Sequence, residues 1–201
     1  MGGAGTVEAI RSRLLQQVDD VNAVTIIENR SDEVDSDGRP PHSFESVVSG
    51  GVDQDVAELL WEVKPAGIET HGNITVTVED SQGESQAIRF SRPVPQYIWV
   101  HLTITPNGVG TFPDNAEDAA IDAIVEYGET LGVGDNVIYQ ALFGPVYSEI
   151  PGIESLSVKI AVSDEAEEEP DSSEFAAENI TIGANEVPLF LADRITVTIN
   201  D

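Results

Sequence analysis

Apolar residues recur every three or four positions in three long stretches of the chain, which is the spacing of one face of a helix. We therefore predict helices over residues 6–21, 53–63 and 115–131. Thr6 and Asn115 stand where the first and third of these helices would begin, and both residue types can cap a helix N-terminus.

Other stretches alternate apolar and polar residues, the pattern of strands with one buried face. The clearest is 97–105, where Tyr97, Trp99 and His101 fall on the side opposite to the aliphatic residues. A short helix is expected from Asn136 to about Phe143, ending at Gly144-Pro145. The other expected strands are 24–27, 44–48, 74–78, 87–90, 156–160, 180–182 and 195–199.

This mixture of elements predicts an α/β (α+β) fold class with two small modules, each a mixed sheet packed by one or two helices. Two prolines in Arg92-Pro93-Val94-Pro95 disfavour both a helix and a central strand. We therefore expect a first module at 1–95, with the N-terminal helix, and a second at 96–201, with a solvated acidic loop at 164–174. The linker would act as a hinge.

The charge balance is strongly acidic, with 9 Lys and Arg against 37 Asp and Glu and a formal net charge of −28. Clustered cations are what nucleic acids and anionic membranes require, so neither is an expected partner. Lys64 and Lys159 are the only lysines. Such a lysine-poor, acidic surface suits a halophilic host, a cationic partner or plain solubility.

Cysteine is absent, which excludes disulfides and Cys-ligated zinc. No stretch reaches the roughly 18 apolar residues that span a bilayer. The first five residues lack the basic and apolar regions of a signal peptide. We expect a soluble protein made in the cytoplasm.

Several segments, in order, resemble the baseplate J-like family of phage assembly proteins. The central signature is Gly38-Arg39-Pro40-Pro41-His42-Ser43-Phe44-Glu45-Ser46-Val47-Val48-Ser49-Gly50-Gly51, followed by Val56-Ala57-Glu58 and Lys64-Pro65-Ala66-Gly67-Ile68-Glu69-Thr70-His71-Gly72. Further agreement lies at Gly5-Thr6, Glu28-Asn29, Ile88-Arg89-Phe90-Ser91-Arg92-Pro93, Pro151-Gly152-Ile153, 180–187 and 195–199.

The resemblance implies a structural wedge component of a contractile phage tail or tail-like injection particle, forming the inner ring of the baseplate. Implied partners are other baseplate wedge proteins and further copies of this chain, as a homodimer or ring. The expected location is the virion tail baseplate, after assembly in the host cytoplasm. No enzymatic activity, cofactor or small-molecule substrate is implied.

Two alternatives stay open. Asp32, Asp35 and Asp37 before Gly38 suggest a calcium-dependent binding module, although Phe44 stands where a calcium loop counted from Glu33 needs a bidentate Glu. A tail-associated glycosidase would need a pair of carboxylates, and the 37 acidic residues leave that pair unspecified.

The best surface candidates are aromatic. Tyr97, Trp99 and His101 share one side of a strand, and aromatic residues are enriched at the centres of protein interfaces. The competing interpretation is that one of the module's own helices covers this side. Trp61 lies beside the apolar stripe of its helix, as an interface anchor or as the edge of the core. We assign no catalytic, cofactor-binding or metal-binding residue.

Overall fold

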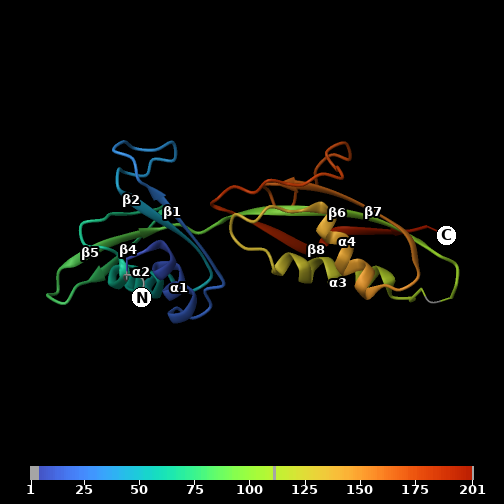
Figure 1. Ribbon diagram of the computed structural model, residues 1–201, viewed down its shortest axis with the longest axis horizontal. Helices are drawn as coiled ribbons and strands as arrows, with labels where there is room; N and C mark the ends of the chain where they lie inside the picture. Colours follow the sequence, from blue (N-terminus) through green and yellow to red (C-terminus); the bar gives the residue numbers. More distant parts are fainter. Residues whose placement is uncertain (1–4, 111, 201) are drawn as a thin grey trace. The chain divides into compact units, whose positions relative to one another are not determined.

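The computed structural model describes residues 5–110 and 112–200, and its contacts divide the chain into two compact units, Met1–Val94 and Pro95–Asp201 (Figure 1). The sequence predicts the change of module between residues 95 and 96. Residues 1–4, on which most of the expectation about a signal peptide rests, lie outside the described residues. The predicted α/β (α+β) fold class is confirmed, since helices pack on small mixed and antiparallel sheets in both units.

The first unit is built on a three-stranded sheet and a hairpin. Its strands are β1 (Ala23–Asn29), β2 (Ser43–Ser49), β3 (Thr70–His71), β4 (Ile74–Glu79) and β5 (Ser85–Phe90). The first three follow the order β1-β2-β3, with β1 antiparallel and β3 parallel to β2. Ser91, directly after β5, joins β2 because its N–H donates to the carbonyl of Ser46 and its carbonyl accepts from Val48 N–H, both at 2.9 Å.

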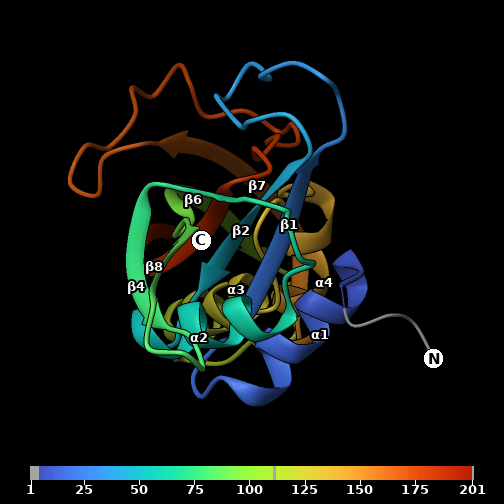
Figure 2. The same cartoon turned by 90° about the vertical axis from the view of Figure 1, so that its left-hand side faces the viewer.

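Helices α1 (Val7–Gln17) and α2 (Asp53–Val63) lie against β1 and β2, and the 30–42 loop joins the ends of these strands and projects away from the helices (Figures 1 and 2). Thr6 caps α1, since its Oγ accepts from Ala9 N–H at 3.2 Å. The predicted α1 was too long, because the backbone is already extended at Val18. The predicted bounds of α2 are confirmed, and its apolar stripe lies in the core of this unit.

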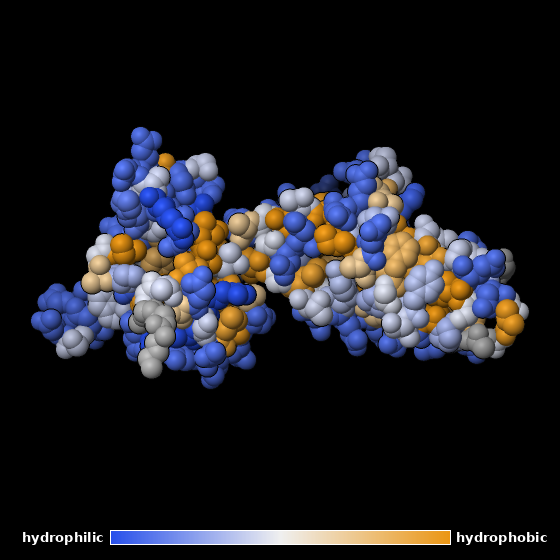
Figure 3. Space-filling model, in the orientation of Figure 1, coloured by the Kyte–Doolittle hydropathy of each residue, from blue (hydrophilic) through white to orange (hydrophobic). Residues whose placement is uncertain are grey.

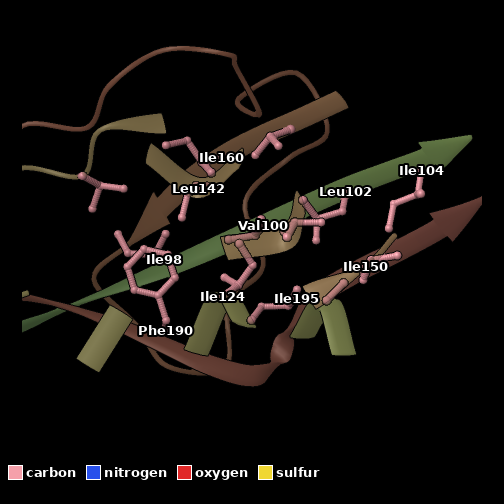
Figure 4. Packing of buried hydrophobic residues seen from close by; sticks show 14 of the residues in the cluster. Ile98, Val100, Leu102, Ile104, Ile124, Leu142, Ile150, Ile160, Phe190 and Ile195 are labelled. Carbon is pink, nitrogen blue, oxygen red and sulfur yellow. The ribbon is translucent and has the colours of Figure 1, made fainter. Parts of the chain in front are cut away.

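The second unit is one sheet with helices on one face. Its elements are β6 (Val94–Pro106), α3 (Ala116–Glu129), the 3₁₀ turn η1 (Tyr139–Leu142), α4 (Phe143–Glu149), β7 (Ile153–Ser163) and β8 (Glu186–Ile199). The strand order is β7-β6-β8, and β6 and β7 are antiparallel. Figure 4 shows the aliphatic side chains of β6 packed with Ile124 of α3 and Leu142 of η1.

Three local predictions about this unit were wrong. The fourth helix does not end at Gly144-Pro145. It begins at Phe143 and runs to Glu149, and Pro145 fits because it stands in the first turn, where no intrahelical N–H bond is lost. Ile180 makes a single bridge with Val137 in place of a strand. The prolines of Arg92-Pro93-Val94-Pro95 were expected to disfavour a central strand, but Val94 and Pro95 begin β6. They stand at the end of β6 where the pairing with β7 has not yet begun.

In the part of the chain that the structure describes, no helix is long and apolar enough to cross a membrane.

Candidate functional site

The outer face of β6, the side opposite to the helices, carries the three aromatic residues singled out in the sequence. Ile98, Val100 and Leu102 are buried against the helices. Tyr97, Trp99 and His101 alternate with them and so point the other way. Their neighbours on β7 are set by the antiparallel register, which places Trp99 opposite Ala161 and His101 opposite Lys159.

This outer face is covered, because Trp99 is only 9% exposed. The cover is residues 164–179, which we call the strap, and which follows β7 directly. Phe175 of the strap forms a small buried cluster with Trp99 and Ala161. The same ring stacks on His101, with centroids 3.7 Å apart and ring planes at 9°.

Hydrogen bonds hold the strap at both ends of the covered area. Ala176 and Ile160 of β7 exchange two backbone bonds of 2.9 and 3.0 Å, so this part of the strap adds a bridge to the free edge of β7. Gln96 Nε2 donates to Asp164 Oδ1 at 3.0 Å. Glu169 Oε1 lies 3.4 Å from His101 Nε2.

Arg194 of β8 is the cation that links the aromatic residues to the acidic strap. Its guanidinium lies 5.3 Å from the ring centroids of both Tyr97 and Trp99, within the range of cation–π contacts. It donates to the carbonyl oxygen of Ala166 and lies 3.9 Å from a carboxylate oxygen of Glu167. At 5% exposure, Arg194 is a buried charge that the rings and the strap stabilise together.

The competing interpretation, that one of the module's own helices covers this face, is therefore wrong, because an irregular acidic segment covers it instead. The expected solvated loop at 164–174 does have exposed carboxylates, yet it also provides contacts to Arg194 and His101. Two residues that make the arrangement, Phe175 and Arg194, were missed. Their signal was composition, since Phe175 directly follows the acidic run and Arg194 is the only arginine after residue 94.

Trp61 lies in the other unit, on α2, half-buried at the edge of the core. Lys64 Nζ lies 5.1 Å from the centre of its ring. A surface hollow of about 570 Å³ is lined by Trp61 together with Glu58, Glu62 and Glu79. The proposed role of Trp61, Tyr97, Trp99 and His101 at an interface stays a prediction.

The three aspartates considered for calcium lie in the 30–42 loop of the first unit and already have partners. Arg39 Nε donates to Asp35 Oδ2 at 2.7 Å, and Arg39 also pairs with Asp37. Asp32 lies 2.9 Å from Nε2 of His42. Within residues 5–110 and 112–200, no group of three or more His, Asp or Glu side chains is arranged to hold a metal ion.

Arg39 extends inward from this loop to a buried carboxylate. Its Nη1 donates to Glu45 Oε2 at 2.8 Å, and Ser91 Oγ donates to Glu45 Oε1 at 2.5 Å. Burial acts to lower the pKa of Arg39, but the hydrogen bonds to Glu45 and Asp35 outweigh it and raise that pKa. Burial acts to raise the pKa of Asp35, and hydrogen bonds from Arg39 lower it overall.

Arg92 fixes the glycine turn that follows β2. Its guanidinium donates to the carbonyl oxygens of Val48 and Gly51 at 3.0 and 2.7 Å, and to Asp53 Oδ1 at 2.6 Å. It thereby joins the end of β2, the turn and the start of α2.

A comparison of the sequence with protein-family models found no match. A comparison with curated proteins found no match either.

Proposed function

We propose that this chain is a structural wedge component of a contractile-tail baseplate, acting through protein contacts and not through chemistry on a ligand. The observation that carries the proposal is that the residues of the family resemblance hold the fold of the first unit together. The motif that runs from Gly38 to Gly72 folds into β2, α2 and β3, and its polar residues are used to hold the first unit together.

Glu45 is the clearest case. A buried carboxylate in an enzyme would have to be free to accept a proton or attack a substrate. Here both oxygens of Glu45 are occupied, one by Arg39 and one by Ser91. Arg39 and Glu45 belong to the central signature, and Ser91 belongs to a second matching stretch. Their contacts therefore support a role of the matching residues in the framework of the fold rather than in an active centre.

The glycines of the motif have a similar role. Gly50 has φ +77°, and a Cβ there would lie 2.0 Å from the carbonyl oxygen of Asp20. Gly72 has φ +152°, and a Cβ there would lie 2.2 Å from the backbone of Phe90. Both positions require the absence of a side chain, because two backbone segments approach each other closely. The motif is thus explained by packing.

A protein with this role binds its neighbours in the ring through exposed surfaces on rigid units. Interfaces between the wedge proteins of one particle persist through assembly, so they bury large areas with apolar centres. The expected partners are the other baseplate wedge proteins and further copies of this chain.

The test is native mass measurement of the intact chain, alone and mixed with each candidate wedge protein from the same tail gene set, in low and in molar salt. The proposal predicts a complex of fixed stoichiometry with at least one wedge protein. An unrelated acidic protein of similar size serves as the control for charge-driven association. If the chain stays monomeric with every wedge protein at every salt concentration, the proposal is wrong.

A further inference from the structure

A second aromatic feature, on the helix side of the second unit, has no role in the site described above. Tyr139 of η1 and Phe143 of α4 contact edge to face, with ring centroids 5.9 Å apart at 76°. Tyr147 follows Phe143 by one helical turn, and residues four apart lie on the same side of a helix. We call these three residues and Ile138 the aromatic stripe.

The stripe lies beside the fully buried side of the same segment, and its Tyr139 and Phe143 also pack against the core. Leu142, Val146 and Ile150, also spaced by four, are almost fully buried. Tyr147 is 48% exposed and Ile138 is 40% exposed, while Tyr139 and Phe143 are half-buried. Figure 3 shows orange residues reaching the surface over the part of this unit that contains α4 in Figure 1.

The space beside the stripe is open. A Cβ placed on Gly144, the residue after Phe143, would meet no atom within 4 Å. Large rings that are half-buried and stand next to open space are typical anchors at the centre of a protein interface, because the bound partner completes their burial.

The charges around the stripe define what kind of partner fits. Exposed Glu178 precedes Asn179, whose Oδ1 accepts from Tyr139 N–H at 3.1 Å. Residues 95–201 hold more than half of the 37 acidic residues, and their only lysine and arginine are Lys159 and Arg194. Arg194 is buried. A second copy of this unit would therefore bring like charge against like charge.

We propose that the aromatic stripe is the docking surface for a protein with a basic surface that surrounds one or more exposed aliphatic side chains. The aliphatic side chains would pack on Tyr147, Phe143 and Ile138, and the surrounding lysines or arginines would face Glu178 and the other exposed carboxylates of this unit. The identification of this partner as a member of a ring assembly rests on the proposed function. The docking surface itself can be tested without it.

The assay uses fluorescein-labelled helical peptides and the intact chain. One peptide has leucine on one face and lysine on the other, a second replaces leucine by serine, and a third replaces lysine by glutamate. Anisotropy is measured at about 0.15 M NaCl, where surface charges still attract over roughly 8 Å. The variants are the double substitution Ile138→Ser and Tyr147→Ser, and Val109→Ser as a matched control, since Val109 is 75% exposed in the same unit.

The inference predicts that the leucine–lysine peptide binds the wild type at least about tenfold more tightly than either other peptide, the change expected for one good apolar anchor. The double variant, with its unfolding midpoint checked, should lose that preference, and Val109→Ser should keep it. Unchanged binding by the double variant, or equal binding of the leucine–glutamate peptide, would overturn the inference. A wild-type homodimer that the double variant loses would also overturn it.

The two proposals fail separately. Complex formation with a wedge protein, together with peptide binding that ignores the stripe, leaves the assembly role standing and removes the docking surface. Stripe-dependent binding of the leucine–lysine peptide, without a complex with any wedge protein, does the reverse.

Discussion

The imidazole ring of His101 lies flat against the ring of Phe175, with centroids 3.7 Å apart. This contact joins the middle of the central strand β6 to an acidic segment that begins more than 60 residues later. Because Phe175 also packs on Trp99, the strap is held firmly against the outer face of β6. The strap thereby buries Trp99 and leaves Tyr97 and His101 half-buried.

The first prediction concerns this cover. Phe175→Ala should expose Trp99 and lower the free energy of unfolding by up to about 3 kcal/mol, the lower end for loss of a buried phenylalanine. The measurement is tryptophan fluorescence in a Trp61→Phe background, so that Trp99 is the only tryptophan. The expected result is a red-shifted emission that iodide quenches more strongly. The control is Ser172→Ala, an exposed strap position, and emission like that of the control would contradict the account.

The second prediction concerns the buried pair of Arg39 and Glu45. Arg39→Met should destabilise the first unit by about 3 kcal/mol, because it leaves a buried carboxylate without its cation. Replacing both residues by methionine should cost less than the single change, because the unpaired charge is gone as well. Chemical denaturation of all three proteins tests this, and a double variant less stable than the single would refute it.

Two glycines allow backbone strain to be separated from steric clash. Gly38 and Gly50 have similar φ values of +82° and +77°, but only a Cβ on Gly50 would meet another atom within 4 Å. Gly38→Ala should cost about 1–2 kcal/mol for the left-handed backbone alone. Gly50→Ala should cost a further 1–3 kcal/mol or so for the clash with Asp20. Equal unfolding midpoints for the two variants would contradict this account.

The hydrogen bonds of Asp80 predict that the stability of the hairpin of β4 and β5 depends on pH. Its Oδ1 accepts from the N–H groups of Glu84 and Gln82, and these bonds lower the pKa of Asp80. A carboxyl whose pKa is lower in the folded state stabilises the fold above its unfolded pKa of about 3.9, and loses that contribution as pH falls through the folded value.

The wild type should therefore lose more stability than Asp80→Ala as the pH falls from about 5 to about 3, the range around that reference pKa. Asp19→Ala, an exposed aspartate in the same unit, is the control and should follow the wild type. Parallel pH curves for wild type and Asp80→Ala would show that the turn does not depend on the ionised carboxylate.

The net charge of −28 gives the last prediction. Molar salt shortens the Debye length to about 3 Å and so screens the repulsion among exposed carboxylates. The thermal unfolding midpoint should rise steadily between low and molar NaCl. An unchanged midpoint would remove the basis for relating this surface to a halophilic host.

Much of the fold could be predicted because its elements have strong local patterns. The periodicity of α2 and the alternation in β6 both reflect a single buried side, and a single buried side leaves a regular sequence signal. Glycine and proline were less reliable guides. Gly144-Pro145 was interpreted as the end of a helix, but a proline in the first turn is compatible with a helix start, and α4 begins at Phe143, two residues before Pro145.

The strap could not be predicted in the same way. Its position depends on Phe175, which stacks on His101 of β6, and on Arg194 of β8, which donates to Ala166. Neither contact is marked by a periodic pattern in the sequence. High local charge indicated a solvated loop. That interpretation did not include the buried Arg194, which lies near the carboxylates of Glu167 and Asp193 and over the rings of Tyr97 and Trp99. Long-range contacts of this kind leave almost no trace in local composition.

The most direct test of the central claim is quantitative mass spectrometry of purified contractile tail particles from the organism that encodes this chain, combined with an antibody label seen by electron microscopy. The account predicts this chain in a fixed ratio to the other wedge proteins, with the label at the baseplate. Particles that have complete baseplates but contain none of this chain would contradict it.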